Sequence, residues 1–366
     1  MNKKNATKPA WIISSYWLDM SRSLFEHLDD VTGELTADQS KAALVLELAR
    51  IETLVADLSS RFGRPGSSRK GIARAFLVKA TLNIPATKDL IERLRVDTRL
   101  RRLCGFKAKV PSESTFSRAF KAMADSGVLD QAHERAVRAH YADAVVHHVS
   151  RDSTAIKVRE EPLAKPKPEP REKQKCGRKC KGEVRKRTRQ ETQAEQSWPE
   201  SLSELPKGCA LGVKKNSKGK QEFWIGYKSH VDVADGGVPL SFCTTSATLH
   251  DSQAAIPLMK MTNSRVGTVF YQLMDKAYFA ELIFKAAAAL GQVAIVPAKN
   301  YQTKPAVPLD PAQKKRFQNR TTVERFFCEL KENHGGNHIR VKGWAKVHAH
   351  LMCGVLTSFA LACLRL

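Results

Sequence analysis

Three acidic residues stand where carboxylates could act together on a metal ion. Asp152 ends a strand-like run that begins at Ala144, Asp275 follows a second such run, and Glu324 stands in a stretch with helical spacing. Carboxylates at the ends of neighbouring strands of an α/β sheet can converge on one point, and they repel each other unless a cation lies between them. Because oxygen ligands favour Mg²⁺ or Mn²⁺, the three acids predict a two-ion site that acts on a phosphodiester.

The helical stretch around Glu324 adds a second pattern. At about 100° per residue, one face about 60° wide, which we call the stripe, carries Phe317, Arg320, Glu324 and Lys331. An acid thus lies between two bases that could hold phosphate groups. The alternative is a solvated helix face on which Arg320 simply pairs with Glu324. Either aspartate taken alone is more often a turn or cap residue.

The charge balance of the 366-residue chain is strongly basic. It has 61 Lys and Arg against 37 Asp and Glu, a formal net charge of +24. Such an excess indicates a polyanionic partner, and nucleic acid in preference to an anionic membrane surface. No membrane span is expected, because the longest weakly polar stretch, residues 351–364, is shorter than the roughly 20 residues that a span needs. Eight cysteines at irregular spacing indicate reduced thiols and a cytoplasmic protein.

Several further residues are candidates for contact with DNA. A possible recognition helix opens with Ser114, Thr115, Arg118 and Lys121. The alternative is that the serines cap this helix and the basic side chains only solvate it. Lys228 is explained equally well as a phosphate contact or as an exposed strand residue, and Asp251 as a metal ligand or as a helix N-cap.

Residues 1–143 predict an all-α, DNA-binding N-terminal domain. Apolar residues recur there at helical spacing, and tight polar turns separate the apolar runs. Helices are expected at residues 37–58, 69–82, 88–94, from about 112, and at 128–141.

Residues 144–366 predict an α/β domain whose mixed sheet has flanking helices, with Asp152 on the first strand and Asp275 after the fourth. Strands are expected from 144 to 152 and at 223–234, 238–244, 268–273 and 292–296, and helices at 252–261, 280–290, from 317, and at 344–364. Between Ala155 and Lys220, 19 Lys and Arg stand against 9 Asp and Glu, with few large apolar residues. Residues 155–220 therefore predict a basic, disordered insertion.

The sequence resembles the DDE transposases of bacterial insertion sequences, in the subgroup with a Tyr-(2)-Arg-(3)-Glu-(6)-Lys signature. The stripe follows that spacing, with Phe317 in place of the tyrosine, so the tyrosine hydroxyl is absent. The other similar stretches are Asp152-Ser153-Thr154, Asp275-Lys276-Ala277-Tyr278, 225–228, 249–252 and 110–120. Only 48 residues separate Asp275 from Glu324, and the large β insertion that some relatives use for hairpin processing is not expected there.

This resemblance implies an RNase H-like catalytic domain and a metal-dependent enzyme that cleaves DNA and transfers strands. It implies that Asp152, Asp275 and Glu324 hold two Mg²⁺ or Mn²⁺ ions, and that Arg320 and Lys331 bind the element ends. The expected partners are double-stranded DNA and a second copy of the chain, in the nucleoid of a bacterial cytoplasm. Two alternatives remain: a non-catalytic DNA-binding protein, such as a decayed transposase or a regulator, and a structure-specific RNase H-like nuclease.

Overall fold

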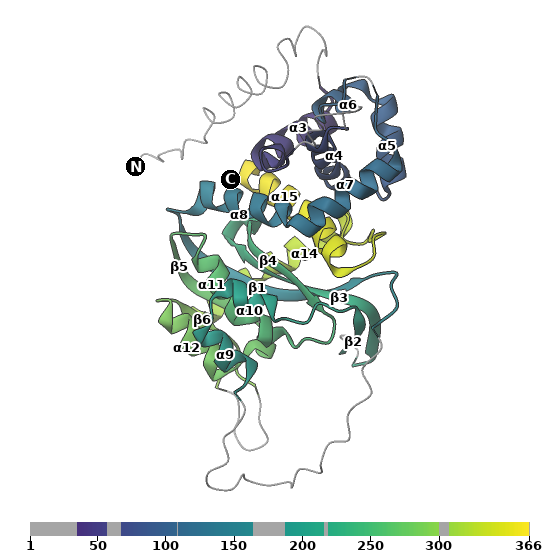
Figure 1. The fold of residues 1–366 in the computed structure, drawn as a ribbon. Coiled ribbons are helices and arrows are strands. Elements are labelled where there is room, and N and C mark those ends of the chain that lie inside the picture. Colours follow the sequence, from purple (N-terminus) through teal and green to yellow (C-terminus); the bar gives the residue numbers. More distant parts are fainter. Residues whose placement is uncertain are drawn as a thin grey trace, which may run out of the picture.

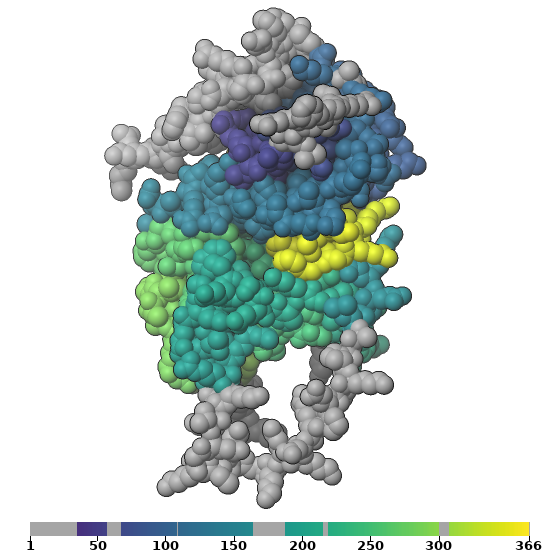
Figure 2. Space-filling view, in the orientation of Figure 1, coloured from purple at the N-terminus to yellow at the C-terminus, as the bar shows by residue number. Residues whose placement is uncertain are grey.

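The computed structural model describes residues 35–56, 67–107, 109–163, 187–215, 219–299 and 307–365. A layer of helices packs on a six-stranded mixed sheet, and further helices flank the sheet (Figure 1). In the space-filling view the blue and purple helical layer lies directly on the teal and green residues of the sheet half (Figure 2).

The helical layer is built by local signals that start and stop each helix. The hydroxyl of Ser68 accepts the backbone N–H of Gly71, and Gly127, with φ +64°, separates two consecutive helices. The layer consists of α3 (Ala37–Ala49), η1 (Ile51–Thr53), α4 (Arg69–Thr81), α5 (Thr87–Val96), α6 (Thr98–Leu103), α7 (Glu113–Ser126), α8 (Val128–Tyr141) and the C-terminal α15 (Trp344–Arg365).

The helix α15 joins the two halves of the chain. It packs against α3, α4, α7 and α8 of the helical layer and against one strand of the sheet. It is also the one helix of the described residues that is long and apolar enough to cross a membrane, and most of it is buried inside the protein. One hydrophobic core contains Phe76 and Phe116 of the helical layer together with Val231 of the sheet and Leu356 of α15. The apolar composition of α15 is therefore explained by its place in this core.

The sheet combines parallel and antiparallel pairs in the order β2-β3-β1-β5-β6, and the remaining strand β4 pairs with β3. β1 is parallel to β5, and β5 to β6, whereas β3 is antiparallel to β1, β2 and β4. The strands are β1 (Val145–Lys157), β2 (Ala210–Lys215), β3 (Gln221–Ala234), β4 (Pro239–Ser246), β5 (Thr268–Met274) and β6 (Val293–Ile295).

Alternation along β3 separates the two faces of the sheet. Val231 belongs to the core shared with α14 and α15, whereas the carboxylate of Asp232, on the other face, accepts a hydrogen bond from Thr262 of α11. The helices of the sheet half are α9 (Arg189–Glu195), α10 (Trp198–Ser203), α11 (Ala255–Asn263), α12 (Glu281–Ala289), α13 (Pro311–Phe317) and α14 (Thr321–Asn333). The 3₁₀ turns are η2 (Asp235–Gly237), η3 (Asp251–Ala254), η4 (Lys276–Tyr278) and η5 (Gln318–Arg320).

Two sequence expectations about strands need correction. The first strand does not end at Asp152, because residues 153–157 continue to pair with β3. The range 155–220 is not unstructured throughout, because the end of β1, α9, α10 and β2 lie in it, while residues 164–186 and 216–218 are outside the described residues. Since β2 adds a strand, Asp275 follows the fifth strand rather than the fourth.

The helix expected from residue 317 also differs. The helical run begins earlier, at Pro311, and passes through the 3₁₀ turn η5 before α14 starts. The constant 100° per residue assumed for the stripe therefore does not hold across Gln318–Arg320. In the helical layer, the expected helix at 37–58 ends at Ala49, where Arg50 adopts a left-handed conformation, and α6 was not expected.

The position of Gly226 generates a prediction about stability. Its φ is +149°, and a Cβ at this position would lie 2.0 Å from the carbonyl oxygen of Ile156 in β1. Gly226→Ala should therefore lower the free energy of unfolding by on the order of 1–3 kcal/mol, measured by urea denaturation. Gly237→Ala is the matched control, because Gly237 also has positive φ but a Cβ added there would meet no neighbouring atom within 4 Å. An equal loss in both variants would contradict the steric explanation.

Candidate active site

Parallel pairing of β1 and β5 brings the two candidate aspartates together. Arg151 of β1 is the register partner of Met274 of β5, so the next residues on the two strands, Asp152 and Asp275, lie side by side. Asp275 also begins the turn η4, where its Oδ1 accepts the backbone N–H of Ala277 at 2.8 Å. Asp275 is thus both a cap residue and a neighbour of Asp152.

The guanidinium of Arg320 joins β1 to α14. Its Nη2 lies 2.6 Å from Oδ2 of Asp152, and its Nη1 lies 2.7 Å from Oε1 of Glu324. The side chain of Arg320 is 18% exposed, whereas that of Glu324 is 56% exposed. Arg320 is therefore not only the partner of Glu324 on a solvated helix face, because it also reaches a carboxylate in the sheet.

Lys331 makes the second contact between the stripe and β1. Its Nζ lies 2.7 Å from Oγ1 of Thr154, two residues after Asp152. Burial, and then the positive charges of Lys214 and Lys157, lower the pKa of Lys331. The structure thus turns Arg320 and Lys331 toward the same stretch of β1, and Phe317 is half-buried at the end of α13.

Burial opposes ionisation of Asp152. Desolvation raises the pKa of its carboxyl to about 6, and the negative charges of Asp275 and Asp251 act in the same direction. Arg320 and the backbone N–H of Ser153 oppose this rise but do not cancel it. The carboxyl group of Asp152 is therefore in a place where a negative charge is poorly compensated by the protein.

Asp251 is a third carboxylate near the two strand-end aspartates. It is the first residue of η3 rather than its N-cap, which is His250. Its Oδ1 lies 3.0 Å from Nζ of Lys228, and that ammonium also donates to the carbonyl of Leu249. Burial opposes the ionisation of Asp251, but His230 and Lys228 outweigh it and hold the pKa of this carboxyl below its usual value.

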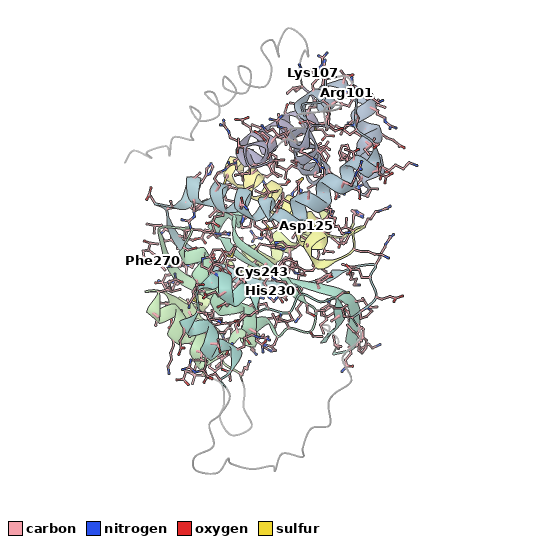
Figure 3. The ribbon with its side chains drawn as sticks, in the orientation of Figure 1. Arg101, Lys107, Asp125, His230, Cys243 and Phe270 are labelled. Carbon is pink, nitrogen blue, oxygen red and sulfur yellow. The ribbon has the colours of Figure 1, made fainter. Side chains whose placement is uncertain are left out.

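The structure therefore gives Lys228 an internal partner, with a side chain only 16% exposed. The two sequence interpretations of Lys228, a phosphate contact and an exposed strand residue, both overlooked this ion pair. Its neighbour His230 lies in the middle of the sheet, close to Cys243 of β4 (Figure 3). The pairing of Lys228 with Asp251 depends on tertiary structure, so no spacing in the sequence could reveal it.

Tyr278 is a further residue of the site for which the sequence suggested no role. It is 1% exposed, and its buried hydroxyl has no hydrogen-bond partner among the described residues. Burial first, and then the charges of Asp251 and Asp152, raise the pKa of this hydroxyl well above its usual value. The only signal in the sequence was its place three residues after Asp275.

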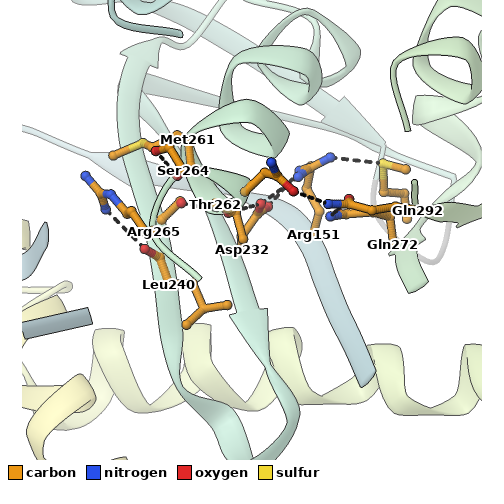
Figure 4. A network of polar contacts seen from close by, with 12 residues as sticks. Arg151, Asp232, Leu240, Met261, Thr262, Ser264, Arg265, Gln272 and Gln292 are labelled. Carbon is orange, nitrogen blue, oxygen red and sulfur yellow. Dashed lines mark hydrogen bonds and ion pairs between the residues drawn. The ribbon is translucent and has the colours of Figure 1, made fainter. Parts of the chain in front are cut away.

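A buried polar network holds the strands that carry the acids. Nε and Nη2 of Arg151 donate to the two carboxylate oxygens of Asp232 at 2.7 and 2.6 Å, and Nη1 lies 3.4 Å from Sδ of Met274 (Figure 4). Thr262 donates to the same carboxylate. Both charged groups are almost fully buried, and removing either partner would leave an uncompensated charge. Because Arg151 precedes Asp152 and Met274 precedes Asp275, this network fixes the backbone on which both aspartates stand.

The candidate DNA-contact residues of α7 lie in the helical layer, whereas Asp152 lies in the sheet. Ser114, Arg118 and Lys121 are exposed, and Thr115 is partly exposed. Lys121 pairs with Asp125 on the same helix. Ser112 stands at the N-cap position without a side-chain capping bond, so the capping explanation of these serines lacks its hydrogen bond.

The two strand-end aspartates offer donors of the kind that suit a hard divalent cation. A cation beside Asp152 would relieve the burial and the like charges that raise its pKa. Within the ranges that the structure describes, however, no three acidic, His or Cys side chains are close enough together to hold an ion. The aspartate pair therefore fits a cation, although Arg320 now pairs with both Asp152 and Glu324.

The fold and the site define an α/β protein whose carboxylates gather at two parallel strands, with Asp152 inside β1 and Asp275 directly after β5. A family model described as a transposase DDE domain matches residues 147–359, and one described as a transposase domain matches residues 38–122. The first covers more than half of the chain, and the chain belongs to the family of transposases with a DDE domain. No curated protein and no solved structure matches the chain significantly.

The raised pKa of Asp152 predicts how stability depends on pH. Between the unfolded pKa, near 3.8, and the folded pKa, about 6, the folded protein binds one more proton than the unfolded chain. This group therefore lowers the free energy of unfolding as the pH rises through that window. In metal-free buffer at pH 7, Asp152→Asn should be more stable than the wild type by roughly 1–3 kcal/mol, measured by urea denaturation.

The control for this prediction is Asp125→Asn, which removes an exposed carboxylate paired with Lys121. That variant should change stability by no more than about 1 kcal/mol. If Asp152→Asn is less stable than the wild type at pH 7, the ion pair with Arg320 outweighs burial and the account of this carboxyl is wrong.

Proposed function

We propose that this transposase cleaves DNA at the ends of an insertion sequence and joins the freed strands to target DNA. One observation carries the proposal: the stripe of a DDE-family chain contacts β1 at Asp152 and Thr154, beside Asp275. The net charge of +24 supports DNA as the partner. The family relationship and the stripe spacing support placing the protein in the Tyr-Arg-Glu-Lys subgroup.

The proposed catalytic domain is RNase H-like. The supporting features are the sheet, in which the hairpin β3–β4 adjoins the parallel strands β1, β5 and β6, and the helices on both of its faces. We assign residues 1–143 to DNA binding and residues 144–366 to catalysis. The shared core around α15 implies that the two parts fold together rather than as separable modules.

Asp152, Asp275 and Glu324 are the proposed ligands of two Mg²⁺ or Mn²⁺ ions. Such ions, when bound, supply activation of the attacking water or 3′-hydroxyl and stabilisation of the charge at phosphorus. The carboxylates of Asp152 and Asp275 are held in place by β1, β5 and the Arg151 network. Glu324 becomes available once Arg320 releases it.

Arg320 is proposed to exchange its carboxylate partners for a phosphate of the element end. Its guanidinium lies between the carboxylates of Asp152 and Glu324, and its buried Nε has no hydrogen-bond partner in the part of the chain that the structure describes. Planar guanidinium groups bind phosphate oxygens as well as carboxylates, and through the same paired donors. Lys331 would hold a neighbouring phosphate as a point charge. Lys228, by contrast, is proposed to act on DNA only indirectly, through Asp251.

Further parts of the proposal concern partners and location. The exposed residues of α7, Ser114, Thr115, Arg118 and Lys121, are proposed to contact double-stranded DNA. From the resemblance we also propose a homodimer on DNA in the nucleoid of a bacterial cytoplasm. A structure-specific nuclease would cut DNA without joining it, and a non-catalytic regulator would do neither, so an assay for strand joining separates the three functions.

The assay uses DNA that carries the inverted repeats flanking the gene, with Mg²⁺ and a target plasmid. Replacing Asp152, Asp275 or Glu324 by Ala should lower cleavage at least about a hundredfold while DNA binding survives. Arg320→Ala, Arg320→Lys and Lys331→Ala should fold but bind element ends less tightly and cleave more slowly. Arg320→Lys tests whether the paired donors of the guanidinium are needed, because this variant keeps the positive charge but loses those donors. Phe317→Tyr should be tolerated.

The control variant is Glu281→Gln, which removes an exposed carboxylate on α12, on the side of the sheet away from the stripe. It should cleave and join like the wild type. Normal cleavage by a folded variant in which both Arg320 and Lys331 are Ala would contradict the role of the stripe. Normal cleavage by any of the three acid variants would remove that acid from the site.

A further inference from the structure

We propose that a basic pocket at the junction of the helical layer and the α14–α15 connection binds a backbone phosphate of DNA. This inference rests on the proposed function, because it takes DNA as the ligand. The pocket, which we call the junction pocket, has a volume of about 380 Å³. Its basic wall consists of Lys79, Arg340, Lys342 and Lys346, with His338 beside them.

Lys79 is the buried cation of the junction pocket. The residue is only 7% exposed, and its Nζ has no hydrogen bond or ion pair with any of the described residues. Burial, and also the charge of Arg340, lower its pKa to about 8, although Cys353 and Asp89 act in the opposite direction. A buried ammonium without an acid beside it is costly, and an anion in the pocket would relieve that cost.

The other basic side chains of the wall are equally unpaired. Arg340 and Lys342 are exposed, Lys346 is partly buried, and none of them forms an ion pair within the described part of the chain. Glu113, at the start of α7, is the acid of the wall and is itself exposed. Several cations that converge without a matching set of acids repel one another and attract an anion.

The position of the junction pocket favours a polymer of phosphates over a single small anion. The connection 334–343 that supplies Arg340 and Lys342 also lines a second pocket with Gly336 and Asn337. That second pocket contains Lys331 and Lys157, together with Lys214, which pairs with Glu222 in the same wall. A basic path therefore leads from the candidate active site along the connection to the junction pocket.

The surface view shows where the C-terminal residues reach the surface. The yellow C-terminal residues emerge between the blue helical layer and the teal sheet half (Figure 2). On its other side the junction pocket is walled by Ser117 of α7, next to the exposed Arg118. A duplex held by α7 and cut beside Asp152 would have to pass this junction. The geometry therefore assigns the pocket to the DNA backbone between these two sites, as a contact that positions DNA and reads no sequence.

The test measures the affinity of the full-length protein for a fluorescent DNA duplex between about 50 and 200 mM salt. One variant combines Lys79→Met with Arg340→Gln, and a second combines Arg340→Gln with Lys342→Gln. The second changes only exposed residues, so it remains informative if the first does not fold. Each variant should bind DNA about tenfold more weakly than the wild type, and the slope of log Kd against log salt should fall by about 1–2.

The matched control combines Arg187→Gln with Lys285→Gln, which removes two exposed charges from the sheet half, far from the junction. Binding by the control variant should follow the wild type. A second arm measures the thermal shift caused by inorganic phosphate at constant ionic strength. If phosphate stabilises the wild type but the pocket variants keep the wild-type affinity and slope for DNA, the pocket binds a free anion and the proposal is wrong.

The remaining outcomes are also decisive. If the pocket variants match the control in DNA affinity and in phosphate response, the proposal for the junction pocket is wrong, but the proposed function is unaffected. A wild-type protein that shows no salt-dependent DNA binding would remove the proposed function together with the pocket.

Discussion

The site depends on a single guanidinium group that lies between two carboxylates. Arg320 contacts Asp152 on the central strand β1 and Glu324 one turn further along its own helix. In this arrangement a protein cation offsets part of the cost of burying the charge of Asp152. From the same helix, Lys331 reaches Thr154. Helix, strand and acids therefore form one unit, whose charge balance must change when a metal ion or a phosphate enters.

The sheet supplies the rigidity that this unit needs. The buried pair of Arg151 and Asp232 connects β1 to β3, and the contact with Met274 connects β1 to β5. Residues at the ends of these strands can thus be held close together even though their charges repel each other. On the opposite side, α15 fixes the helical layer to the sheet through one continuous core. A basic path from Lys331 to Lys79 runs over this junction, so binding of DNA and positioning of the acids depend on the same packing.

Much of the architecture could be predicted from local sequence, because it depends on local chemistry. The helix α8 and the hairpin β3–β4, with its turn at Asp235–Gly237, follow the apolar spacing and the glycines. The extension of β1 past Asp152 was missed, because the charged pair Arg151–Asp152 interrupts the apolar run and the strand continues by pairing with β3. For the same reason β2 was missed in a basic, polar range. In the site, the spacing predicted which residues share a face, but the partners of Arg320 and Lys228 are set by tertiary contacts.

We propose that Arg320 holds the carboxylates of Asp152 and Glu324 until a metal ion takes its place. Mn²⁺ binding to the DNA-free protein, measured by electron paramagnetic resonance, tests this exchange. Arg320→Gln should bind Mn²⁺ about tenfold more tightly than the wild type, a difference of about 1.4 kcal/mol, because the competing cation is gone. Arg325→Gln, an exposed change on the same helix, should leave the affinity unchanged, and Glu324→Gln should weaken it. Unchanged or weaker binding by Arg320→Gln would contradict the account.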